Sequence, residues 1–174
     1  MNRRNMILAL SAASIPLLQI SSARAQTVGA GPPMSIYQYT QATLLAGSMS
    51  KQMSDLALQR ATNARVKEFA GFESAEQTTM AQVLTNDPAP PPIPLDVPLA
   101  GALRNLASMS GMEFDQAYVR AQLMGHAQLM QIQQAFLQSQ GNMSTDAAHI
   151  AMLARTTIEM HLTMLQDVQN ALQS

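Results

Sequence analysis

The sequence has no cysteine and no tryptophan, and only 12% of its 174 residues are charged. Without cysteine, the chain has no disulfide framework, no thiolate metal site and no cysteine to carry a lipid anchor. Lysine and arginine are scattered and do not outnumber the acids, which argues against binding to nucleic acid or to an anionic membrane surface. With so few charges, we expect packing rather than salt bridges to stabilise the fold.

The N-terminal residues have the three parts of a secretory signal peptide. Arg3 and Arg4 give a basic start, residues 6–20 form an apolar run, and residues 23–25 are Ala-Arg-Ala, followed by Gln26. The run is too short for a stable membrane anchor, and no later segment is long and apolar enough to span a bilayer. We therefore predict cleavage after residue 25 and a periplasmic or secreted protein. The adjacent arginines are similar to a twin-arginine export signal, and the choice between export routes stays open.

Beyond a flexible segment at 26–34, periodic apolar residues predict helices and no strand. We expect four long helices and one short one, at 35–61, 63–85, 99–108, 112–140 and from about 144 to the C-terminus. Residues 86–98 contain six prolines, which cannot continue a helix, so we expect a stiff crossover between the second and third long helices. The pattern predicts one all-α domain at 35–174, a four-helix bundle with a Pro-rich crossover.

Apolar residues three and four apart mark the face of each helix that we expect to be buried. On the last helix this face consists of Ala147, Ala151, Ala154, Ile158, His161, Leu165, Val168 and Leu172. On the third long helix it consists of Phe114, Tyr118, Ala121, Gly125, Leu129, Ile132 and Phe136. His161 is therefore predicted to be buried, His126 to lie on a neighbouring stripe and His149 to be solvated.

The second helix places two carboxylates on its predicted buried face. This face consists of Val66, Phe69, Glu73, Glu76, Met80 and Val83. A buried carboxylate costs several kcal/mol unless a charge, a hydrogen bond or a metal compensates it. We therefore expect Glu73 and Glu76 to find partners, with His126 and His161 as the main candidates.

Several short motifs resemble one family over nearly the whole predicted mature chain. They are residues 66–70 (Val-Lys-Glu-Phe-Ala), residues 111–118 (Gly-Met-Glu-Phe-Asp-Gln-Ala-Tyr), His126 and His161-Leu162. In order and spacing they resemble the secreted bacterial family named domain of unknown function 4142 (DUF4142). The resemblance implies a ferritin-like four-helix bundle, and that family has no established reaction.

The chain departs from the family pattern where metal ligands would be expected. Glu76-Gln77 stands where members usually carry Asp-His, Gly125 replaces an acid, and residues 48–53 lack the usual glutamate. A dimetal site of the ferritin-like kind also needs Glu-x-x-His pairs, and the sequence contains none. The remaining donors, Glu73, Glu76, His126 and His161, suffice for one metal ion at most.

Methionine offers a second donor set. The chain has fourteen methionines, and Met130 and Met164 each follow a histidine by one helical turn, at His126 and His161. A thioether beside an imidazole suits Cu(I), whereas methionine more commonly fills irregular helical cores. We favour core filling.

Taken together, these patterns favour an exported, non-catalytic helical bundle that binds a partner or has a structural role, with no resident cofactor. The alternative is a metal-binding module that holds one ion of iron, zinc or copper, at a reduced Glu/His site or a Met/His copper site. A redox enzyme would need ligands that the sequence lacks, and no His/Asp arrangement activates Ser48, Ser50 or Ser54 for nucleophilic catalysis. No partner is identified, and self-association stays open.

Overall fold

The structure is a computed structural model that describes residues 33–139 and 145–173. The predicted signal peptide, residues 26–32 and the predicted connection between the last two helices lie outside the described residues. Within them the chain forms helices and no strand: α1 (Ile36–Arg60), α2 (Ala64–Thr85), α3 (Val97–Ser108), α4 (Gly111–Ser139) and α5 (Asp146–Ala171). The all-α prediction is confirmed. None of these helices has the length and hydropathy needed to cross a bilayer.

Polar caps fix where the helices begin. The Ser35 hydroxyl accepts from Gln38 N and the Gln38 side chain accepts from Ser35 N, a capping box at the start of α1. Asn63 caps α2 in the same way through Arg65 N. Helix α3 begins at Val97, two residues earlier than predicted, because Asp96 caps it and a proline fits the first turn of a helix.

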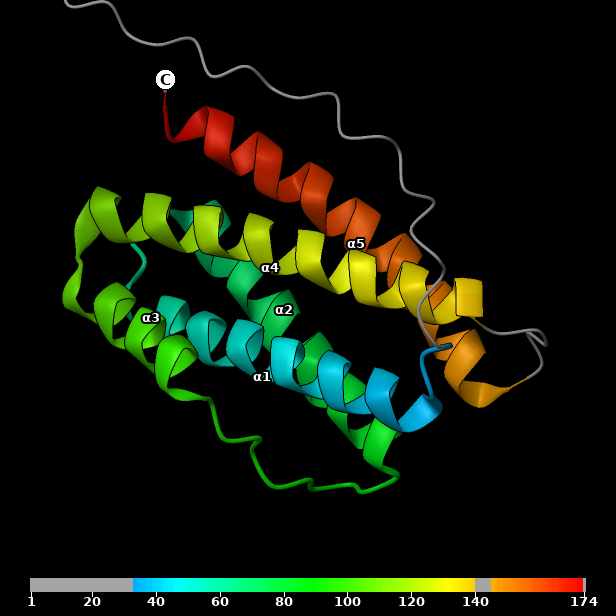
Figure 1. The fold of residues 1–174 in the computed structure, drawn as a ribbon. Coiled ribbons are helices and arrows are strands. Elements are labelled where there is room, and N and C mark those ends of the chain that lie inside the picture. Colours follow the sequence, from blue (N-terminus) through cyan, green and yellow to red (C-terminus); the bar gives the residue numbers. More distant parts are fainter. Residues whose placement is uncertain (1–32, 140–144, 174) are drawn as a thin grey trace, which may run out of the picture. The chain divides into compact units, whose positions relative to one another are not determined.

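The long helices lie side by side (Figure 1), with α1 in contact with α2 and α4, and α5 in contact with α4 and α2. The short turn between α1 and α2 is held onto α4 by Asp115, which is buried. The Asp115 carboxylate accepts from Thr62 N at 3.1 Å and Asn63 N at 2.9 Å. These bonds satisfy backbone donors of the turn that no helix hydrogen bond would pair.

The buried face of α5 agrees with the prediction except at Ala147 and Leu172, which are half-buried, and the buried faces of α2 and α4 differ from it. Residues 151, 154, 158, 161, 165 and 168 of α5 are buried as predicted, and His149 is exposed. On α4 the buried face contains Gln122, His126 and Gln133, whereas Ala121, Gly125 and Ile132 are only half-buried. The helix is rotated relative to the apolar stripe because these polar side chains find partners on neighbouring helices.

Candidate metal centre

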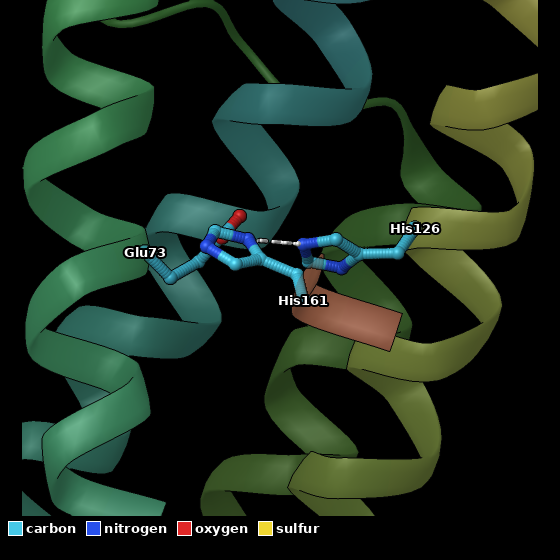
Figure 2. A group of neighbouring side chains, drawn as sticks. All are labelled: Glu73, His126 and His161. Atoms are coloured by element: carbon cyan, nitrogen blue, oxygen red, sulfur yellow. Dashed lines mark hydrogen bonds and ion pairs between the residues drawn. The ribbon is translucent and has the colours of Figure 1, made fainter. Parts of the chain in front are cut away.

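Three helices bring a glutamate and two histidines together in the interior. Glu73 comes from α2, His126 from α4 and His161 from α5, and their side chains point toward one another (Figure 2). Their exposed fractions are 0%, 1% and 4%. We call these three residues the buried triad. The predicted burial of His161 and of one of the two carboxylates is confirmed.

The facing atoms of the buried triad form a nearly regular triangle. Glu73 Oε2 lies 3.2 Å from His126 Nε2 and 3.2 Å from His161 Nδ1. The two ring nitrogens are hydrogen-bonded to each other at 3.2 Å. Ligand atoms bound to a tetrahedral zinc ion at about 2.0–2.1 Å lie roughly 3.3 Å from one another. The triad therefore has nearly the spacing of three metal ligands.

The two oxygens of Glu73 have different surroundings. Oε1 accepts hydrogen bonds from Ser50 Oγ at 2.5 Å and from Gln77 Nε2 at 3.0 Å. Oε2 faces the two imidazoles at ion-pair distance, but neither contact has the angles of a hydrogen bond. Among the described residues, two buried side-chain atoms lack a hydrogen-bond partner: Glu73 Oε2 and Arg155 Nε. Oε1 therefore anchors the carboxylate, and Oε2 is left aimed at the centre of the triad.

Each histidine is also held through its second ring nitrogen. His126 Nδ1 lies 2.8 Å from the carbonyl oxygen of Gln122, which can only accept, so Nδ1 carries the proton and the lone pair of the neutral ring is at Nε2. His161 Nε2 lies 3.4 Å from Glu76 Oε2, on the side away from the triad. Metal-bound histidines in proteins are generally oriented through the second nitrogen in this way.

Glu76 lies outside the triad, contrary to the predicted buried face of α2. Its side chain is 27% exposed, and Gln77 takes the buried position one residue later. The reason is geometric: a step of four from Glu73 keeps Gln77 on the buried face, where its amide bonds to Glu73. Of the four predicted donors, the structure thus brings three together and leaves Glu76 as the outer partner of His161.

The charges of this cluster depend on one another. Burial alone would raise the pKa of Glu73, but its contacts with His126 and His161 hold it below the usual range. Burial would lower the pKa of His161, and Glu73 and Glu76 together raise it above its usual value. Burial raises the pKa of Glu76, against the opposing effect of His161. The contacts within the cluster therefore favour the charged form of Glu73 and a proton on His161.

Apolar groups surround the buried triad. The ring of Phe69 packs edge-on against both imidazoles, with centroid distances of 5.8 Å to His126 and 5.2 Å to His161. Met130 packs against the cluster of Leu129, Ala154 and Ile158, and Met164 against the cluster that contains Phe69. Both methionines are therefore in contact with core residues, and the Met/His copper site stays a prediction.

Sequence reasoning missed the polar residues that support Glu73. Ser50 on α1 also contacts Gln122 Oε1, at 2.6 Å, and Gln122 Nε2 donates to Ser54 Oγ at 3.1 Å. Gly47 leaves room for Gln77, because a Cβ at residue 47 would lie 2.3 Å from Gln77 Oε1. A signal was present on α4, where Tyr118, Gln122 and His126 recur at steps of four and so share a face.

The family model described as domain of unknown function (DUF4142) matches residues 22–168. The chain belongs to this family. Comparisons with curated proteins and with solved structures give no match. The match confirms the resemblance and, because the family carries no assigned role, leaves function to be argued from the triad.

Proposed function

We propose that this protein is an exported metal-binding module that holds one divalent transition-metal ion between Glu73, His126 and His161. Its four long helices, α1, α2, α4 and α5, would form a ferritin-like four-helix bundle, with the Pro-rich segment between α2 and α3 as part of the crossover. The periplasmic or secreted location follows from the predicted signal peptide. We assign no reaction to it, because side chains so deeply buried are out of reach of an organic substrate.

One observation carries the proposal: three ligand atoms from three helices lie 3.2 Å apart, and one of them is a buried carboxylate oxygen without a hydrogen bond. When both neutral rings turn a lone pair toward the carboxylate oxygen, the three atoms repel one another unless a cation lies between them. A metal ion at this point satisfies all three atoms at once, while Ser50, Gln77, Gln122 and Glu76 hold the ligands from behind.

The donor set narrows the choice of ion. Two imidazoles and one carboxylate suit Zn²⁺, Fe²⁺ or Cu²⁺, whereas Mg²⁺ and Ca²⁺ prefer oxygen ligands alone. Three protein ligands leave a fourth position for water. The ring of Phe69 against both imidazoles and the deep burial of the triad favour retention of the ion over exchange with solvent.

A purely structural role is the second candidate, and the raised pKa of His161 favours it. In that case a proton on His161 supplies the positive charge, and the polar cluster fixes the register of α2, α4 and α5. Metal and proton compete for the same position, so the two roles make opposite predictions about metal binding.

The test is a Zn²⁺ titration of the untagged mature protein, stripped of metal and measured by competition with a chromophoric chelator. We expect one equivalent to bind. Glu73→Gln, which keeps the shape of the side chain, should weaken binding by more than the roughly 10–100-fold typical of outer partners. Glu68→Gln, at an exposed position of the same helix, is the matched control and should bind as the wild type does.

A second test compares zinc binding by two histidine variants, one in the buried triad and one at an exposed position. His126→Gln should lose zinc, whereas His149→Gln, at an exposed position of α5, should retain it. A wild-type protein that binds no zinc would favour the structural role. Equal binding by Glu73→Gln and Glu68→Gln would show that zinc binds away from the buried triad.

A further inference from the structure

A groove lies between α1, α2 and the Pro-rich segment 88–93, which runs back along these helices (Figure 1). Its volume is about 350 Å³. Apolar side chains dominate its walls, among them Leu44, Met80, Ala81, Pro90 and Ile93. Small-molecule sites in proteins have volumes of roughly 300–1,000 Å³ and walls of this composition.

Hydrogen bonds hold the Pro-rich segment in place at both ends of the groove. Ser48 Oγ on α1 donates to the carbonyl oxygen of Ile93 at 3.0 Å. Gln82 Nε2 on α2 donates to the carbonyl oxygen of Pro88 at 2.7 Å. The prolines between these two points restrict the backbone further, because each fixes its own φ angle. The groove is therefore formed before any ligand arrives, which lowers the entropy cost of binding.

The charges in the groove cancel. Lys51 and Asp55 both line it and pair with each other, with Nζ 2.7 Å from Oδ2. The second oxygen of Asp55 accepts from Ser74 Oγ at 2.5 Å. The remaining polar groups of the wall are hydroxyls and amides, including those of Thr43, Gln52 and Thr78. This lining favours an uncharged ligand that carries a hydrogen-bonding group.

The groove is too small to enclose a helix from another protein. Two turns of a helix about 10 Å across occupy roughly 850 Å³, more than twice the volume of the groove. We propose that this groove binds one small, uncharged, mainly apolar organic molecule. Gln77 forms part of its wall and also donates to Glu73, so the groove adjoins the buried triad. The proposal does not depend on metal binding.

The test uses N-phenyl-1-naphthylamine, an uncharged aromatic probe whose fluorescence rises in apolar surroundings, with the metal-free mature chain. We expect saturable binding of one equivalent. Ala81→Phe fills the groove from α2 and should weaken binding at least tenfold. Ala75→Phe, at an exposed position of the same helix, is the matched control and should bind as the wild type does.

Ala89→Phe provides a second block that leaves the helices untouched, because Ala89 lines the groove from the Pro-rich segment. Far-UV circular dichroism checks that each variant is folded. If Ala81→Phe is not folded, the binding measured with Ala89→Phe tests the proposal. Loss of binding in the blocking variants with retention in Ala75→Phe supports the proposal. Absence of saturable binding to the wild type, or undiminished binding to folded Ala89→Phe, would overturn it.

Discussion

The interior contains a neutral polar cluster around Tyr39 and a charged one around Glu73. In the first, Tyr39 donates to Gln133 Oε1 at 2.7 Å, Gln133 donates to Thr43 at 3.4 Å, and the tyrosine ring stacks on Phe136 at a centroid distance of 4.1 Å. Burial raises the pKa of Tyr39 to about 12, against the opposing hydrogen bond to Thr43, so the hydroxyl stays protonated near neutral pH. The hydrogen bonds of this cluster are made by side chains of the protein itself.

The cluster around Glu73 is different because three ionisable side chains face one another there. Glu73 Oε2 has no hydrogen bond, and both imidazoles turn a nitrogen toward it. A proton can supply the missing positive charge at one nitrogen, whereas a metal ion can contact all three atoms. Under the proposed function, the neutral cluster stabilises the fold alone, whereas the charged cluster also binds a metal ion.

The largest expected effect comes from removing the carboxylate. Glu73→Ala leaves the two histidines buried without their counter-charge, and breaking a buried ion pair typically costs about 3–5 kcal/mol. Urea melts of metal-free protein should show this loss in the free energy of unfolding. Glu68→Ala, at an exposed position, should change it by less than about 0.5 kcal/mol. A loss below about 1 kcal/mol for Glu73→Ala would mean that the cluster contributes little to stability.

The next effect is the stabilisation by zinc. A ligand that binds only the folded state adds about 2.7 kcal/mol at a hundred times its dissociation constant. We expect this increase in the wild type at saturating free Zn²⁺, measured by the same urea melts. The His126→Gln variant should show none of it. An equal increase in both proteins would contradict binding at the buried triad.

Glu76→Gln should have an intermediate effect. Glu76 orients His161 from outside the triad, and loss of such an outer partner typically weakens metal binding by about 10–100-fold. One equivalent should still bind, with a lower affinity in the chelator competition. Complete loss of zinc would instead make Glu76 a direct ligand, and unchanged affinity would leave it without a role.

The smallest effect is expected in the neutral cluster. Tyr39→Phe removes the hydroxyl and leaves Gln133 Oε1 without its donor, which should cost about 1–2 kcal/mol in the free energy of unfolding. Zinc affinity should stay at the wild-type value. A change in zinc affinity would show that the two clusters are coupled, and the contrast between them would no longer hold.

Much of the fold was predictable because helix ends are encoded locally. Asn63 caps α2 and prolines separate α2 from α3, so the predicted bounds agree with the structure within a few residues. The unbroken apolar spacing of α5 also fixed its buried face. The rotation of α4 was not predictable in the same way. Partners on other helices satisfy the buried side chains of Ser50, Gln122 and Gln133. The sequence of one helix does not show which partners these are.

The site was predictable in its residue types and less so in its geometry. Glu73 and His161 interrupt apolar stripes, which marks them as buried groups that need partners. The choice between Glu76 and Gln77 depended on how α2 is turned, and a difference of one residue moves a side chain by about 100° around a helix. The role of Gly47 depends on the approach of Gln77 from another helix, which the sequence of α1 does not contain.

The most direct measurement is an anomalous difference map from crystals of the mature protein soaked in Zn²⁺ and recorded at the zinc edge. We expect one strong peak inside the protein, at about 2.0–2.2 Å from Glu73 Oε2, His126 Nε2 and His161 Nδ1. A map with no peak between these atoms, or with zinc only at surface groups such as His149, would contradict metal binding by the buried triad.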